Sequence, residues 1–126
     1  QPLWVRVDSV QIEQVLLNLL RNALDALSMI TPADRHLIVS TGIQPDGMVY
    51  VSVDDNGVGI AGKAMEHLFD PFYSTKESGM GMGLAISQTI MTNHNGRIRA
   101  DSWPGRGSVF TIELPAGMDA VISAAS

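Results

Sequence analysis

The sequence has no cysteine among its 126 residues. Disulfide bonds and thiolate metal sites are therefore excluded, and a reducing compartment is indicated, so we expect a cytoplasmic location. No apolar run is long enough to cross a bilayer, so this chain is expected to make no direct membrane contact. It opens at Gln1 without an initiator methionine, which suggests a fragment whose parent protein could carry a membrane segment elsewhere.

Basic residues are also scarce. Lysine and arginine number 8 against 13 aspartates and glutamates, a formal net charge of −5, and charges of both signs are interleaved. A nucleic-acid binder would show a basic face, so we expect no nucleic acid as a partner. An anionic nucleotide is still allowed, because backbone N–H groups and a few local cations can bind phosphate. Hydrophobic residues make up 45% of the chain, which is typical of one globular domain.

Hydrophobic periodicity predicts alternating helices and strands. Apolar residues recur at helical spacing from Val10 to about Ser28, with Asp8 or Ser9 as the cap. Strands are predicted at residues 3–7, 37–43, 48–54, 97–102 and 108–114, and shorter helices at 63–69 and 83–94. One domain would cover residues 1–115, and the small-residue tail 116–126 is expected to be disordered.

Side-chain alternation assigns the two faces of the predicted sheet. Val49, Val51 and Val53 share one side, and Asp55 continues their row. In the last strand the apolar residues share a side with Ser108, whereas alternate residues point away. One face would then be covered by helices and the other would be wet. We predict an α/β two-layer sandwich with a mixed, mostly antiparallel sheet and helices on one face.

The first helix carries a polar stripe of Gln14, Asn18, Asn22 and Asp25. A solvated face is the simplest interpretation. However, asparagine costs several tenths of a kcal/mol relative to alanine in a helix, roughly, so two asparagines one turn apart indicate that their amides are used. An amide oxygen is a hard, neutral ligand, suited to one position on a Mg²⁺ ion that keeps its waters and binds phosphate oxygens.

A second polar cluster follows the strand that ends near Asp54. A strand-ending turn would explain Asp, Asn and Gly here. Yet Asp55 lies on the buried side of its strand, where a lone carboxylate is costly, and a donor such as an adenine amino group would satisfy it. Residues 57–62 also match the dinucleotide fingerprint G-x-G-x-x-G. That interpretation requires an acidic residue at the end of a strand about 20 residues on, and a glycine-rich loop stands there instead, so we reject it.

Alternate glycines in Gly79-Met80-Gly81-Met82-Gly83-Leu84 lead directly into a predicted helix. Glycines alone could mark a flexible linker, and residues 73–82 are expected to form a mobile loop. Placed against a helix start, however, they offer backbone N–H groups to an anion at the positive end of the helix dipole. No G-x-x-x-x-G-K-[ST] segment occurs, so this is not a Walker-type phosphate loop.

In order, these segments resemble the ATP-binding catalytic domain of bacterial sensor histidine kinases, a Bergerat fold, over nearly the whole chain. The matching motifs are an asparagine box (Asn18, Asn22), a D-x-G-x-G box at Asp55, a phenylalanine box at residues 68–76, the second glycine box at 79–84 and a final G-S-x-F before Leu114. The short lid, roughly residues 74–82, is similar to that of a phenylalanine-box subset of these kinases.

The resemblance implies roles for individual residues. Asn22 would be the Mg²⁺ ligand, with Asn18 near the phosphates, and Asp55 would bind the adenine amino group. Thr75 and Lys76 would begin the lid, and Asn18, Asn22 and Lys76 would serve catalysis. The nucleotide-binding set is Asn18, Asn22, Asp25, Asp55, Gly57, Gly59, Thr75, Lys76, Gly79, Gly81, Gly83, Leu84 and Ser108.

Two features separate this chain from hydrolytic relatives of the same fold. Position 18 resembles the glutamate that activates water in gyrase-type and chaperone ATPases, and the amide of Asn18 cannot take a proton at neutral pH. Glu13 lies on the opposite side of the helix. Slow hydrolysis is therefore expected, which leaves the γ-phosphoryl group for transfer to a histidine.

None of His36, His67 and His94 has the setting of a phosphoacceptor. The implied partners are a separate dimerisation segment that carries the acceptor histidine and, indirectly, a response regulator. The alternatives are an ATPase or serine kinase on the same fold, and a nucleotide-binding regulatory module without transfer.

Overall fold

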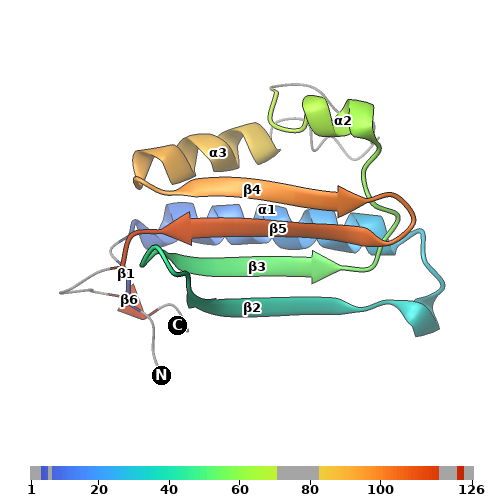
Figure 1. Ribbon diagram of the computed structural model, residues 1–126, viewed down its shortest axis with the longest axis horizontal. Helices are drawn as coiled ribbons and strands as arrows, with labels where there is room; N and C mark the ends of the chain where they lie inside the picture. Colours follow the sequence, from blue (N-terminus) through green and yellow to red (C-terminus); the bar gives the residue numbers. More distant parts are fainter. Residues whose placement is uncertain (1–3, 6, 71–82, 117–121, 124–126) are drawn as a thin grey trace.

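The computed structural model describes residues 4–5, 7–70, 83–116 and 122–123 (Figure 1). Its elements follow the order β1 (Trp4–Val5), α1 (Ser9–Leu27), a 3₁₀ turn (Pro32–Asp34), β2 (Leu37–Ile43), β3 (Val49–Asp55), α2 (Gly62–Glu66), α3 (Gly83–Asn93), β4 (Arg97–Trp103), β5 (Gly107–Leu114) and β6 (Ile122–Ser123). Among these described elements, no helix is long and apolar enough to cross a membrane.

The main sheet has four strands in the order β2-β3-β5-β4, and each neighbouring pair is antiparallel. The α/β fold with an open antiparallel sheet and helices is confirmed. The sequence predicts a mixed, mostly antiparallel sheet, and all pairs between the described strands are antiparallel. Short hairpins require this orientation for the β2–β3 and β4–β5 pairs, whereas β3 and β5 are joined through α2, α3 and β4 and pair antiparallel without a hairpin.

Two short strands lie apart from the main sheet. β1 pairs antiparallel with β6, and Val5 also bridges to Ala116. The predicted disordered tail therefore contains a paired segment at Ile122–Ser123, whereas most of residues 116–126 lies outside the described part of the chain. The proposed domain boundary at residue 115 stays a prediction.

The two longer helices cover the same face of the sheet (Figure 1). α1 begins where the Asp8 carboxylate accepts a hydrogen bond from the Gln11 N–H at 3.1 Å, so Asp8 is the cap. α1 lies over β3, and α3 packs against both α1 and β4. The core between the layers includes Val15, Leu19, Val53, Met91, Phe110 and Ile112.

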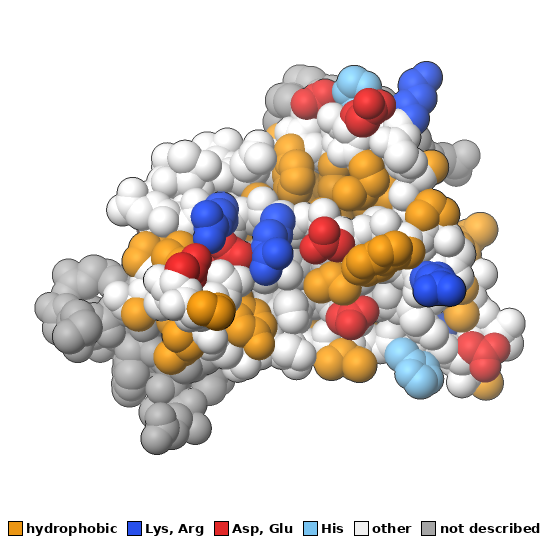
Figure 2. Space-filling view, viewed as in Figure 1, with side chains coloured by type: hydrophobic (Ala, Val, Ile, Leu, Met, Phe, Trp, Pro, Cys, Tyr) orange, Lys and Arg blue, Asp and Glu red, His pale blue; other side chains and the backbone are white. Residues whose placement is uncertain are grey.

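The opposite face of the sheet is less exposed to solvent than the sequence predicts. Glu113 points to this open face, yet only 2% of it is exposed. It accepts hydrogen bonds from Arg97 and from Gln44, the latter at 2.7 Å, and Arg99 lies 2.9 Å away. Long arginine side chains on the neighbouring strand thus cover the carboxylate. In Figure 2 this face shows basic and acidic side chains beside one another.

Burial alone would raise the pKa of the Glu113 carboxyl. The hydrogen bonds from Arg97 and Gln44 and the positive charges of Arg97 and Arg99 outweigh that effect, so the pKa lies below its ordinary value of 4.5. This carboxylate is therefore a charged structural anchor between β5 and β4.

Candidate nucleotide-binding site

The polar stripe of α1 faces inward along part of its length. Asn22 is a polar residue, yet it is only 7% exposed, like its neighbours Ala23 and Leu19 in the apolar core. A buried asparagine on a helix is costly unless its amide has a partner. The position therefore fits a ligand-binding role, as the sequence predicts.

Asn18 connects α1 to the start of α3. Its side-chain nitrogen donates hydrogen bonds to the carbonyl of Gly83 and to Oγ of Ser87, both at 3.1 Å. The predicted site residues Asn18 and Gly83 are thus brought together. Ser87, fully buried, was not predicted. The signal that could have found it is a serine at a core position of α3, between Leu84 and Met91.

Asp55, at the end of β3, is 3% exposed and lies opposite Ser108 on β5. Its Oδ1 accepts a hydrogen bond from the Gly57 N–H at 2.8 Å. This bond turns the chain sharply after the strand and holds the carboxylate at the edge of the core. Asp55 and Ser108 therefore share a side of the sheet, as predicted from the alternation.

Gly57 and Gly59 are required by close backbone contacts. A Cβ at Gly57 would lie 2.7 Å from the backbone carbon of Ala26 in α1. Gly59 has a φ of +76°, and a Cβ there would lie 2.5 Å from the carbonyl oxygen of Trp103. The loop after β3 is therefore held between the end of α1 and the β4–β5 turn.

The β4–β5 turn is bonded to this loop. The Ile60 N–H donates to Oγ of Ser102 at 2.7 Å, and the Gly105 N–H donates to the carbonyl of Val58 at 2.9 Å. Oγ of Ser108 lies 2.8 Å from Oγ of Ser102. The hydroxyl of Ser108, predicted near adenine, thus belongs to a small network that fixes one wall of the site. Ser102 was not predicted.

Asp25 lies one turn beyond Asn22 on the same stripe. Its Oδ2 is buried and has no hydrogen-bond partner among the described residues. An unpaired buried carboxylate oxygen is costly, and a cation or a donor arriving from outside would satisfy it. Within the described residues no group of three or more His, Asp or Glu could hold a metal. Mg²⁺ in nucleotide sites needs only one or two protein ligands, so Asn22 and Asp25 fit it.

The structure describes only some of the residues predicted for the lid and the second glycine box. Thr75, Lys76, Gly79 and Gly81 lie outside the described residues, and their roles stay predictions. Gly83 is the first residue of α3, and the first N–H groups of a helix have no partner within the helix. Leu84 contributes its side chain to the core, so any contact it makes with nucleotide would come from its backbone.

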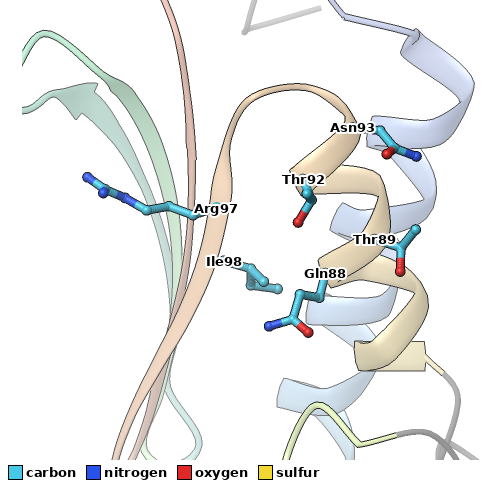
Figure 3. A pocket seen from close by; sticks show the side chains of 6 residues that line it. All are labelled: Gln88, Thr89, Thr92, Asn93, Arg97 and Ile98. Carbon is cyan, nitrogen blue, oxygen red and sulfur yellow. The ribbon is translucent and has the colours of Figure 1, made fainter.

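A hollow of about 270 Å³ lies elsewhere, between α3 and β4. Figure 3 shows Gln88 and Ile98 pointing toward each other across it, whereas Arg97 extends to the other face of the sheet. Its lining is mostly hydroxyl and amide groups, and none of the predicted site residues takes part. It is therefore separate from the site around Asn22 and Asp55.

Residues from four segments thus meet beside the second half of α1: the stripe itself, the loop after β3, the β4–β5 turn and the start of α3. A family model described as histidine kinase-, DNA gyrase B- and HSP90-like ATPase matches residues 7–118. The chain belongs to this family of ATP-binding domains. Within it, the chain is an ATP-binding catalytic domain of the two-component sensor histidine kinase type.

The relatives support this assignment. The sensor protein FixL of Bradyrhizobium diazoefficiens is 43% identical over 112 residues, which cover 89% of this chain and 22% of FixL. The solved catalytic domain of the histidine kinase ThkA has a TM-score of 0.73 at 34% identity, covering 88% of this chain and 70% of that one. Full-length ShkA, solved in complex with AMPPNP, has a TM-score of 0.70 at 28% identity, covering 88% and 22%.

The chain spans about a fifth of the length of the curated relatives it matches. The ATP-binding family and the kinase type are confirmed. The phenylalanine-box subset, the Mg²⁺ ion, the cytoplasmic location and the individual site residues stay predictions.

Proposed function

We propose that this domain binds ATP with Mg²⁺ beside α1 and transfers the γ-phosphoryl group to a histidine on a separate dimerisation segment of its parent protein. The observation that carries the proposal is a set of buried polar side chains, Asn22, Asp55 and Asp25 with its unpaired Oδ2, on two segments that touch where Gly57 packs against Ala26 of α1. Full-length ShkA, which this chain resembles, was solved in complex with AMPPNP, and this supports nucleotide binding by the shared fold. A response regulator would then receive the phosphoryl group from the histidine.

The adenine would lie against the wall formed by the loop after β3. The carboxylate of Asp55 would accept a hydrogen bond from the adenine amino group, and Gly57 and Gly59 would let the backbone approach the flat base. Ser108 would support this wall through its bond with Ser102. The hydrogen bond between Asp55 and the Gly57 N–H already fixes the carboxylate in place, which lowers the cost of ordering it on binding.

The phosphates would lie between the α1 stripe and the start of α3. Asn22 would ligate Mg²⁺, whose charge offsets that of the phosphates, and Asp25 would add a carboxylate oxygen directly or through water. Gly83 and the backbone N–H of Leu84 would face the phosphates from the helix end. Thr75, Lys76, Gly79 and Gly81 would close over them from the lid.

Transfer to histidine is favoured over hydrolysis by the setting of Asn18. Its amide donates to Gly83 and Ser87, so it holds the two helices together and has no basic atom to activate water. The acceptor imidazole needs no such base, because its own nitrogen lone pair forms the N–P bond while the bond to the β–γ bridging oxygen breaks.

A two-part assay tests the proposal. The chain with ATP and Mg²⁺ is expected to release phosphate slowly, and to label a separately supplied helical hairpin that carries the acceptor histidine. Asn22→Ala should abolish labelling, whereas Gln14→Ala, an exposed change on the same stripe, should leave it intact. Brisk release of phosphate without the hairpin would favour the ATPase alternative.

Binding without transfer would favour a regulatory module instead. Isothermal titration of ATP with and without Mg²⁺ separates the two steps, because a module without transfer would bind nucleotide and label no hairpin. Labelling of His36, His67 or His94 in the chain itself would contradict the assignment of the acceptor to another segment.

A further inference from the structure

β2 is an edge strand of the main sheet, and none of its residues carries a charge. It reads Leu-Ile-Val-Ser-Thr-Gly-Ile from Leu37 to Ile43. Among the described strands it has β3 on one side and none on the other (Figure 1). Ile38, Val39 and Ile43 are 55%, 53% and 60% exposed. Natural edge strands are usually short, charged, bulged or broken by proline, and β2 has none of these protections.

The β2–β3 hairpin fixes which backbone groups of β2 face the free edge. The Gln44 N–H donates to the Met48 carbonyl at 2.8 Å, and the Asn56 N–H donates to the His36 carbonyl at 3.3 Å. Bonded and non-bonded pairs alternate along an antiparallel ladder, so the even-numbered residues between 36 and 44 bond to β3. The N–H and C=O groups that point to the free edge therefore belong to Leu37, Val39, Thr41 and Ile43.

We propose that two copies of this chain associate through β2, antiparallel about a two-fold axis at Ser40, so that their sheets become continuous. This register pairs Leu37 with Ile43 of the partner subunit and Val39 with Thr41 of the partner subunit. All four outward-facing residues of each copy are then bonded, for roughly eight backbone hydrogen bonds in total. A shift by two residues would leave outward groups unpaired, so the register about Ser40 is preferred.

The side chains match in the same register. On the helix-covered face, exposed Leu37 meets an isoleucine and exposed Val39 meets a threonine. On the open face, Ile38 lies opposite Gly42 of the partner subunit. A Cβ at Gly42 would lie 2.7 Å from the Tyr50 ring, so this ring covers the glycine and offers a flat apolar surface to the incoming isoleucine. No like charges meet within the paired strands.

The partner is taken to be a second copy because β2 is complementary to itself in length, free backbone groups and side-chain size. A pair of seven-residue strands buries less than the roughly 1,200 Å² of standard interfaces, so the association should be reversible and dependent on concentration. The pairing leaves the site beside α1 uninvolved, so it does not depend on the proposed function.

Cysteine scanning on β2 tests the register directly, because the chain has no cysteine of its own. The two Ser40 residues would form a non-bonded pair with Cα atoms about 4.5 Å apart, within the range of a disulfide. Ser40→Cys is expected to give a disulfide-linked dimer as the main product under mild oxidation. Thr41→Cys, one residue along and exposed, should link several-fold more slowly because the two positions are offset across the axis.

Sedimentation velocity over a concentration series tests the association without a crosslink. The natural chain is expected to show a dimer that grows with concentration, and Val39→Lys should abolish it. Thr92→Lys, at an exposed position on α3, should leave it unchanged, and circular dichroism should show all variants folded. A natural chain that stays monomeric at several hundred micromolar, or equal linking rates at positions 40 and 41, would overturn the proposal. Dimerisation insensitive to Val39→Lys would place the interface elsewhere.

Discussion

The side-chain nitrogen of Asn18 in α1 lies 3.1 Å from Oγ of Ser87 in α3, and it donates a second hydrogen bond to the Gly83 carbonyl. One amide thus joins the two helices that cover the sheet. Because Gly83 is the first residue of α3, the bond fixes the helix end that would face the phosphates. A residue predicted only from its place in the nucleotide site is therefore also part of the helix interface.

Ser87→Ala is expected to destabilise the fold by about 1 kcal/mol, because one hydrogen bond to the Asn18 amide is lost in a buried place. Thr89→Ala, an exposed change on the same helix, should alter the free energy of unfolding by less than about 0.5 kcal/mol. Urea unfolding followed by circular dichroism measures both. Equal effects of the two changes would show that the contact between Asn18 and Ser87 contributes nothing.

Asn18→Glu tests the contact between α1 and α3 by changing the residue that donates both hydrogen bonds. A carboxylate cannot donate a hydrogen bond to the Gly83 carbonyl, so the substitution should weaken the joint between α1 and α3 as well as introduce a base. We expect a lower unfolding midpoint together with any gain in phosphate release. A fully stable variant with fast hydrolysis would show that the amide bonds are dispensable.

Asp55→Asn is expected to weaken ADP binding by about 1.5–3 kcal/mol, roughly 10- to 150-fold in Kd, because a donor replaces one acceptor oxygen opposite the adenine amino group. Asp54→Asn is the matched control, since its side chain is exposed on the opposite face of the same strand. Isothermal titration measures both affinities. Unchanged binding by a folded Asp55→Asn protein would exclude the adenine role.

Gly59→Ala is expected to destabilise the protein by about 1–3 kcal/mol. The residue has a φ of +76°, and the added methyl group would meet the Trp103 carbonyl at 2.5 Å. Gly62→Ala, where no atom lies within 4 Å of the new Cβ, should be neutral or stabilising by up to about 1 kcal/mol. Thermal unfolding of the pair distinguishes a strained loop from a general preference for glycine.

Glu113→Gln is expected to cost about 1.5–3 kcal/mol at neutral pH, because the charged hydrogen bonds to the buried carboxylate are lost. Since the folded-state pKa lies below 4.5, the natural chain gains this stability above that pH and loses it as the pH falls through the folded value. The difference between the two proteins should therefore shrink in acid. A difference that stays constant from pH 7 to pH 3 would contradict the charge assignment.

Local pattern was sufficient to predict most elements and the side on which Asp55 and Ser108 lie. The predicted strand at residues 37–43 agrees with β2, because β-branched residues and a clear turn at Pro45-Asp46-Gly47 bound it. Contacts between distant segments could not be predicted in the same way. Nothing in the sequence near Ser87 indicates a partner on α1.

The burial of Glu113 on the open face of the sheet also could not be predicted from the sequence. Alternation correctly predicts that Glu113 lies on the open face of the sheet. It does not predict that Arg97 and Arg99 from the neighbouring strand cover the carboxylate. That coverage depends on the register of β4 against β5 and on how long side chains lie across it. The short helix ended at Glu66 rather than near Phe69, because residues 67–69 form turns in place of a further helical turn.

The last long strand in the sequence, β5, occupies an interior position of the sheet, between β3 and β4. During synthesis on the ribosome, β3 therefore keeps an unpaired edge until the chain has been extended through Leu114. The β4–β5 hairpin must then dock onto a strand made much earlier, a non-local step of the kind that slows folding. Premature termination before this strand would leave the inner edge of β3 open to pairing with other chains, so incomplete products should be prone to aggregation and early degradation.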